Sequence, residues 1–331
     1  MYERNTDRSS DPSWQVAPTP KAKVRLDAFL RRCVPGVSLR EVRRWIEAGK
    51  VRINRRMGKK GDMLAGGEIV AFCGPPDWLA PGPVPRSDLD VVTIYEDDAI
   101  LVLDKPAGMA THGFSGREAN SVANYLVATR PLLRHVGKNV WEPGLVHRLD
   151  RETSGLVLVA KGQEVFEALR LQFQQRQVQK KYWALVLGRT ERQGVIDYPL
   201  SHDPADRRKM KTVFNDGAPS KRKRKKWEAL TRFDRTAYGK GFSLLEVDMK
   251  TGVTHQIRAH LASIGHPLAG DVLYGSQPAP TGFSRRHFLH AHSLGFCHPR
   301  TLKPVVFESP MPQELQEALN RLGMKAPKPC R

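Results

Sequence analysis

The sequence has little cysteine and no long hydrophobic run. Its 331 residues include four cysteines, none in C-x-x-C spacing, so it predicts neither a disulfide framework nor a cysteine-bound zinc site. No apolar stretch approaches the roughly 20 residues that span a bilayer, and neither end carries an amphipathic anchor or a signal-peptide pattern. We therefore expect a cytoplasmic protein that does not bind membranes. The GxxxxGK phosphate-binding loop is also absent, which argues against nucleotide hydrolysis.

Acidic residues are outnumbered by basic ones. The chain has 54 Lys and Arg against 34 Asp and Glu, a formal charge of +20, so its natural partner is a polyanion. Nucleic acid is favoured over a membrane surface, because no membrane-binding segment is found. An apolar content of 40% excludes a wholly disordered protein, and the length is enough for two or three domains.

Histidines are the one group that suggests a metal. The chain has eleven, including His290, His292 and His298 close together. No carboxylate or cysteine completes a known ligand spacing around these three, and packing on a β-strand explains them equally well. We expect no metal and no cofactor.

Composition divides the chain into segments. Residues 1–22 are polar and aperiodic and predict a disordered tail. Residues 74–90 contain five prolines and predict an extended, semi-rigid linker. Strand-like and helical patterns then mix through residues 91–312, which favours an α+β domain, and residues 313–331 read as a C-terminal helix and tail. Further helices are expected over residues 164–177, from Thr254 to Gly265, and over residues 312–322.

Residues 23–73 read as a small α/β domain. An apolar spacing from Leu26 to Cys33 predicts one helix, a capping-box pattern at Ser38 and Glu41 begins a second, and two short strands follow. This stretch resembles the small RNA-binding domain first recognised in ribosomal protein four of the small subunit. A charge-rich helix is often only a solvated surface, but two basic elements around a compact core favour contact with phosphate. The predicted RNA-binding residues are Arg40, Arg43, Arg44 and Lys50.

One polar cluster adjoins a buried strand pattern in LVHRLDRETSGLVLVAK, residues 145–161. Asp150 lies between two arginines, whose positive charge should keep it ionised and suits a nucleophile or base. Taken alone, the cluster is more typical of a surface loop of solvated ion pairs.

Further motifs change that reading. They are YEDDAILVLDKPAGMATH at 95–112, KKYWALVLG at 180–188, GVTHQIRAHLASIGHPLAGDVLYG at 252–275 and LHAHSLGFCHP at 289–299. With residues 145–161 they closely resemble the RluA family of RNA pseudouridine synthases. The resemblance implies a mixed, mainly antiparallel central sheet with flanking helices, a cofactor-free isomerase, and structured RNA as substrate.

The resemblance also implies roles for single residues. Asp150 falls on the catalytic aspartate, Tyr182 on the tyrosine of the second motif, and Arg258 on the arginine that pairs with the aspartate. Arg148 matches the arginine that family members can insert where the target uridine leaves its stack. Strand alternation places Tyr182 beside Ala184 and Val186, so its ring can stack on a flipped uracil or serve only for packing.

Two features depart from the family pattern. Val253 occupies a position where the family usually has arginine, so one cation is missing there. Residues 221–226 are six consecutive basic residues, a run that is usually solvated or serves nuclear targeting. In a chain of this charge we favour an RNA-gripping loop and name Lys221, Arg222 and Lys223 as contacts.

The sequence therefore predicts a monomeric enzyme that makes pseudouridine in ribosomal RNA, in the large subunit, because family members with the appended domain act there. A transfer RNA substrate is the alternative within this class. A non-catalytic RNA-binding factor for ribosome assembly is the alternative from another class.

Overall fold

The computed structural model describes residues 3–5, 13–15, 23–34, 37, 39–73, 82–113, 119–213, 225–275, 283 and 286–327. Contacts divide the chain into two compact units, residues 1–85 with 113–119 and residues 86–112 with 120–331. We call them the N-terminal and the C-terminal unit. Most of the expected tail, Ser38, residues 74–81 of the expected linker and the predicted contacts Lys221, Arg222 and Lys223 lie outside the described residues.

The N-terminal unit packs two short helices against small strands. Val42, Trp45 and Ile46 are buried on one face of the second helix, as their spacing predicts, and the ring of Trp45 meets that of Phe72 edge-on at 5.0 Å. Positive φ at Gly49 ends this helix without strain. The elements are β3 (Val24–Arg25), α1 (Leu26–Cys33), α2 (Leu39–Glu47), β4 (Val51–Ile53), β5 (Arg56–Met57), β6 (Met63–Leu64) and β7 (Ile69–Phe72).

Two further strands lie in the segment expected to be disordered. β1 (Glu3–Asn5) pairs with β2 (Ser13–Gln15), and β2 pairs antiparallel with β7. The expectation of no structure is wrong for these residues. An edge strand presents a row of N–H and C=O groups that a polar segment can pair with, and a hydrophobic pattern does not reveal such pairing.

The C-terminal unit is built on a mixed sheet. Among the described residues its strand order is β12-β15-β16-β11-β17-β10-β9-β8, and β18 pairs with β17. The β10–β17 pair is parallel and the others are antiparallel, which confirms a mainly antiparallel α+β fold. The strands are β8 (Val92–Glu96), β9 (Ile100–Lys105), β10 (Ser154–Ala160), β11 (Gln179–Leu187), β12 (Gln193–Ile196), β15 (Thr231–Gly239), β16 (Phe242–Met249), β17 (Leu289–Cys297) and β18 (Pro304–Glu308).

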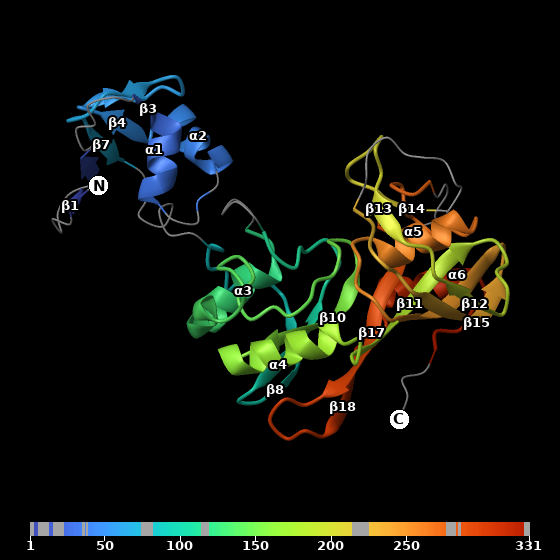
Figure 1. Ribbon diagram of the computed structural model, residues 1–331. Coiled ribbons are helices and arrows are strands. Elements are labelled where there is room, and N and C mark those ends of the chain that lie inside the picture. Colours follow the sequence, from blue (N-terminus) through green and yellow to red (C-terminus); the bar gives the residue numbers. More distant parts are fainter. Residues whose placement is uncertain are drawn as a thin grey trace. The chain divides into compact units, whose positions relative to one another are not determined.

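Helices cover this sheet in separate groups (Figure 1). α3 and α4 lie beside its β8–β10 end, whereas α5 lies beside the hairpin of β13 (Leu200–His202) and β14 (Met210–Thr212). α5 begins after His255 instead of at Thr254, because His255 takes a left-handed backbone and becomes the N-cap. The helices are α3 (Val122–Thr129), the 3-10 helix η2 (Pro131–His135), α4 (Gln163–Gln174), α5 (Gln256–Ser263) and α6 (Gln313–Arg321).

Alternation along β11 separates two cores. Tyr182, Ala184 and Val186 belong to the main core with β9 and β10, as their period of two predicts. Leu185 on the opposite face packs into a second core, which includes Leu315 of α6. One face of β11 therefore remains available to form the wall of a site. No helix of the described residues is long and apolar enough to cross a membrane.

Candidate active site

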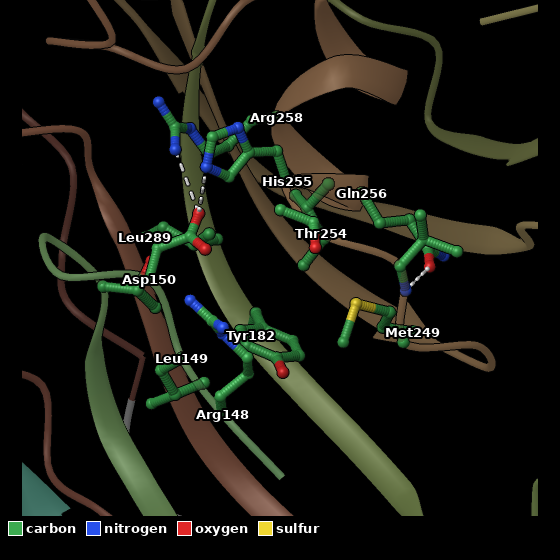
Figure 2. A pocket seen from close by; sticks show the side chains of 14 residues that line it. Arg148, Leu149, Asp150, Tyr182, Met249, Thr254, His255, Gln256, Arg258 and Leu289 are labelled. Carbon is green, nitrogen blue, oxygen red and sulfur yellow. Dashed lines mark hydrogen bonds and ion pairs between the residues drawn. The ribbon is translucent and has the colours of Figure 1, made fainter. Parts of the chain in front are cut away.

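A cleft on the C-terminal unit gathers residues from four distant parts of the chain (Figure 2). They come from the loop before β10, from β11, from the segment between the end of β16 and α5, and from the start of β17. About 90 Å³ is open to the centres of water molecules, which is room for several waters or one flat ring. The lining residues are Arg148, Leu149, Asp150, Thr153, Tyr182, Met249, Gly252, Val253, Thr254, His255, Gln256, Ile257, Arg258 and Leu289.

Asp150 is held on a loop that is pinned on both sides. The Thr111 hydroxyl donates to the Leu149 carbonyl at 2.8 Å and accepts from the Leu149 N–H at 3.0 Å. After the loop, Gly155 has φ +114, and a Cβ there would collide with the Ala291 carbonyl of β17. Glycine is thus required for the close approach of β10 to β17, and this approach fixes the end of the loop.

Arg258 connects Asp150 to a second, buried carboxylate. Its Nη1 donates to Asp150 Oδ2 at 3.0 Å, while Nε and Nη2 donate to the two oxygens of Asp271 at 2.7 and 3.0 Å. The family resemblance implied that Arg258 pairs with Asp150, and it does so through one nitrogen, whereas its two-pronged contact is with Asp271. Asp150 accepts one hydrogen bond from Arg258. The two hydrogen bonds to Asp271 therefore orient Arg258 toward Asp150.

Burial and charge act in opposite directions on this ion pair. Burial lowers the pKa of Arg258, but the hydrogen bonds and charges of Asp271 and Asp150 outweigh it and raise that pKa. Burial raises the pKa of Asp271, and Arg258 outweighs it and lowers that pKa. Arg258 is 8% exposed and Asp271 1% exposed, whereas Asp150 is 21% exposed. The carboxylate that faces the cleft is therefore the accessible member of the group.

Tyr182 forms a wall of the cleft from β11. It is 4% exposed, and burial, with the charge of Asp150 second, raises the pKa of its hydroxyl. The phenol therefore stays protonated and is no base. Its ring lies near Asp150 in Figure 2, where a flat group could rest against it.

Arg148 stands at the rim of the cleft. It is exposed, and its Nη1 lies 3.3 Å from His112 Nε2. His112 Nε2 in turn lies 3.6 Å from Glu142 Oε1. An exposed guanidinium therefore stands beside the cleft.

Gln256 shapes the turn before α5. Its side-chain oxygen accepts from the Thr251 hydroxyl at 2.7 Å and the Val253 N–H at 3.1 Å, and its amide donates to the Leu230 carbonyl and the Thr231 hydroxyl, both at 3.0 Å. A buried amide with four hydrogen bonds holds a single orientation. The turn therefore presents Val253, where the family pattern has arginine, in a fixed position.

Lys105 is not among the residues that line the cleft. It is fully buried, and its ammonium donates to the carbonyls of Pro106, Met109 and Arg151 at 2.9, 2.8 and 3.1 Å. Burial lowers its pKa to about 7. Lys105 ties the loop after β9 to the Asp150 loop.

The predicted RNA contacts of the N-terminal unit differ in their surroundings. Arg43 donates to the buried Asp27 at 2.9 Å, and Arg44 reaches both oxygens of Glu41 at 2.8 and 2.9 Å. Arg40 is exposed and Lys50 half-buried. A hollow of about 450 Å³ next to Asp27 is lined by Arg25, Asp27, Ala28, Arg31, Arg32, Leu39 and Arg43. Its cations come from β3, α1 and α2, and those on β3 and α1 were not predicted.

The three histidines that suggested a metal each have a protein partner. His290 Nδ1 lies 2.9 Å from the Ser154 hydroxyl, and His298 Nε2 lies 2.9 Å from Asp97. The His292 ring stacks on Trp183 at 4.4 Å. Within the described part of the chain, no group of three His, Cys, Asp or Glu side chains could hold a metal ion.

Three site residues were not predicted. Asp271, His255 and Tyr274 all fall within the stretch 252–275 that carried Arg258, and Tyr274 places its ring 5.1 Å from the Arg258 guanidinium. His255 Nε2 lies 3.7 Å from Asp150 Oδ2. Their signal was the clustering of polar residues in one motif, which periodicity does not detect.

Comparisons with known proteins agree with this geometry. Residues 99–263 match the family described as RNA pseudouridylate synthase, and residues 24–70 match the S4 domain. The chain is 39% identical to an uncharacterized RNA pseudouridine synthase of Chloroflexus aurantiacus over 94% of each chain. It is 35% identical to ribosomal large subunit pseudouridine synthase D of Neisseria meningitidis, over 98% of this chain and 88% of that one. Among solved structures, human RNA pseudouridylate synthase domain containing 4 matches with a TM-score of 0.56 at 26% identity, over 71% of this chain and 94% of that one.

Proposed function

Because the chain belongs to the RNA pseudouridine synthase family, we propose that this isomerase converts uridine to pseudouridine in RNA of the large ribosomal subunit, with Asp150 as its catalytic carboxylate. Several similar proteins, from Neisseria, Nitrosomonas and Xanthomonas, are named ribosomal large subunit pseudouridine synthase D, which supports this substrate over transfer RNA. An S4 domain ahead of the catalytic unit gives the chain a second RNA-binding module.

The observation that carries the proposal is the chain of contacts Asp271–Arg258–Asp150 at the cleft. A buried guanidinium fixed by one carboxylate aims its remaining N–H at the other, so Asp150 is oriented before substrate arrives. Such preorganised charge stabilises a transition state without rearrangement during the reaction. Arg258 is a positioning residue, since it acts through Asp150.

The reaction moves one bond and one proton. The bond from ribose C1′ to uracil N1 breaks, a bond from C1′ to C5 forms, C5 loses its proton and N1 gains one, so no redox partner is needed. Asp150 can attack the sugar or the base, or help remove a sugar proton, and its negative charge also suits an electron-poor sugar in the transition state. Tyr182 supplies a flat wall for the uracil while it turns.

A uridine within a helix must leave its stack to reach the cleft, at a cost of a few kcal/mol that loops and bulges largely avoid. Arg148 lies at the rim with the length and charge to fill the space that the base vacates. Structured loops of ribosomal RNA are therefore the proposed target.

We further propose the division of labour along the chain. Residues 23–73 bind RNA, residues 74–90 link, residues 91–312 catalyse, and the segments 1–22 and 313–331 flank them. The enzyme acts as a monomer in the cytoplasm. Gel filtration with light scattering, and fractionation of cells, test the last two points.

The decisive experiment replaces Asp150 with Asn, which keeps shape and removes charge. In cells that lack the wild-type gene, pseudouridine at the target positions of large-subunit RNA should be lost, a fall in rate of at least about 10⁴-fold. RNA affinity should stay within about twofold, because RNA affinity comes from cations that neutralise phosphates and Asp150 is an anion. Modification retained by the variant contradicts the role of Asp150, and modification found only in transfer RNA contradicts the substrate.

A further inference from the structure

We propose that His255 is a positioning residue for Asp150: its neutral imidazole carries the proton on Nε2 and directs it at Asp150 Oδ2, which leaves Oδ1 to meet the substrate. This inference rests on the proposed role of Asp150. His255 lines the cleft, and no element of the proposed mechanism uses it so far.

The tautomer follows from the partners of Tyr274. The Met210 N–H donates to the Tyr274 oxygen at 2.8 Å, and this oxygen lies 3.2 Å from His255 Nδ1. Burial raises the pKa of Tyr274 to about 12, so the phenol keeps its single proton. Among the described residues Nδ1 is the acceptor that this proton meets. Nδ1 therefore accepts, and in a neutral imidazole the proton must then be on Nε2.

The other side of the ring gives the same answer. Nε2 lies 3.7 Å from Asp150 Oδ2. The opposite tautomer would aim a lone pair at a negatively charged oxygen, whereas the Nε2–H tautomer aims a positive hydrogen at it. At this separation the contact is electrostatic and longer than a hydrogen bond, as contacts at a catalytic group often are before substrate binds.

The two oxygens of Asp150 consequently differ. Arg258 Nη1, at 3.0 Å, and His255 Nε2 both approach Oδ2, and the two dashed lines that reach Asp150 in Figure 2 end on that oxygen. The described residues place no hydrogen bond on Oδ1. Oδ1 is then the oxygen that reacts, because the two donors at Oδ2 lower the basicity of Oδ2.

The backbone of His255 supports a functional placement. Its φ of 53° lies in the left-handed region, which costs about 1 kcal/mol for a residue with a Cβ. Such strain persists where surrounding structure enforces it, and it clusters at active sites. Here the His255 carbonyl accepts from the Ala259 N–H at 2.9 Å and begins α5, so the ring is directed into the cleft.

The charges around His255 keep it neutral. Burial lowers its pKa; Arg258 and Arg148 act in the same direction, while Asp150 and Asp271 oppose them. Tyr274 faces the ring from the segment after α5. At neutral pH the imidazole thus carries one proton, and the hydrogen bond from Tyr274 to Nδ1 determines that this proton is on Nε2.

The direct test is ¹⁵N NMR of the full chain labelled at histidine, with the His255 signal assigned by its absence in His255→Gln. We expect the shifts of a neutral Nε2–H imidazole in the wild type. Tyr274→Phe, which keeps the ring over Arg258 and removes the hydroxyl, should give a mixture of tautomers. A wild-type signal from the Nδ1–H tautomer overturns the inference.

A matched pair of amides tests the consequence for catalysis. Asn tolerates the left-handed backbone better than Gln does, so a larger loss in the Asn variant cannot come from backbone strain. The amide of His255→Gln can reach Asp150, and the shorter one of His255→Asn cannot. We expect kcat to fall about tenfold for Asn and about threefold or less for Gln, with KM for a large-subunit RNA fragment unchanged within twofold. If His255 had a purely structural role, kcat should fall by the same factor in both variants. Wild-type kcat in both variants overturns the inference. If the wild type itself made no pseudouridine, the proposed function would fail, while the NMR result would still decide the tautomer.

Discussion

Each unit contains carboxylate–arginine ion pairs with one buried partner. The buried partner is an aspartate in the N-terminal unit and an arginine in the C-terminal unit. In the N-terminal unit, Asp27 is 2% exposed and holds Arg25 and Arg43, which are 49% and 38% exposed. In the C-terminal unit, Arg258 is 8% exposed and holds Asp150, which is 21% exposed. In each case the buried partner is the anchor, and the partner nearer to solvent is the group presented. One unit therefore presents cations suited to phosphate, and the other presents an anion suited to a reacting sugar.

Removing the deeper anchor should have the largest effect. Asp271→Asn leaves Arg258 buried with one carboxylate instead of two, and breaking a buried pair costs about 3 kcal/mol of unfolding free energy. Because Arg258 then no longer aims at Asp150, kcat should fall about 100-fold. Denaturant titration and single-turnover assays measure the two effects. Full activity in a destabilised variant would show that Arg258 does not need Asp271 for its orientation.

The next largest effect should be a difference between the two units in how much stability they lose in acid. All eleven histidines lie in the C-terminal unit and none within residues 1–85. Burial lowers the pKa of His147 and His287 to about 3 and that of His290 to about 4, against 6.5 for an ordinary histidine. Below about pH 6.5 these histidines are therefore protonated in the unfolded chain but stay neutral in the folded chain. This stabilisation is complete above about pH 6.5 and is lost as the pH falls toward those folded-state values.

Hydrogen exchange on the full chain can measure this difference. Between pH 7 and 6 the C-terminal unit should lose about 2 kcal/mol of protection, after correction for the intrinsic exchange rate, and the N-terminal unit should change less. Equal losses in both units would mean that the buried histidines are not the acid-sensitive groups.

The smallest expected effect is on RNA binding. Asp27→Asn should release Arg25 and Arg43 from one geometry and weaken RNA affinity about tenfold without changing kcat, since an anchored charge-assisted contact contributes about 1.4 kcal/mol. Asp88→Asn is the matched control, because it adds the same charge and breaks the exposed pair with Arg86. Higher affinity for Asp27→Asn than for the control, in filter binding at fixed salt, would mean that Asp27 restrains these arginines instead of presenting them.

Periodicity predicted what repeats along the chain. The buried faces of α2 and β11 follow from spacings of three to four and of two, and both are observed. Pairing of β1, β2 and β7 was missed, because main-chain hydrogen bonds leave no hydrophobic pattern. The carboxylate partners of Arg43 and Arg44 were missed for a related reason, since a charged helix face does not show which of its cations are already paired.

The site was predicted only in part. Asp150 and Arg258 are 108 residues apart, and their pairing came from resemblance to a family, not from spacing. Asp271 and Tyr274 could not be ranked above other polar residues of the same motif, because their importance depends on which atoms they face after folding. Strand alternation placed Tyr182 correctly on one face of β11, but only the cleft shows that this face is a wall of the site.

The parallel pairing of β10 with β17 has a consequence for how the enzyme matures. It joins Ser154 to His290, so the Asp150 loop is backed by a strand made 136 residues later. Contacts of such long sequence separation form slowly, because a large loop must close first. A chain emerging from the ribosome carries its RNA-binding unit well before its catalytic loop is supported. RNA binding can therefore precede catalytic activity during synthesis. Pseudouridine formation then indicates that β10 has paired with β17.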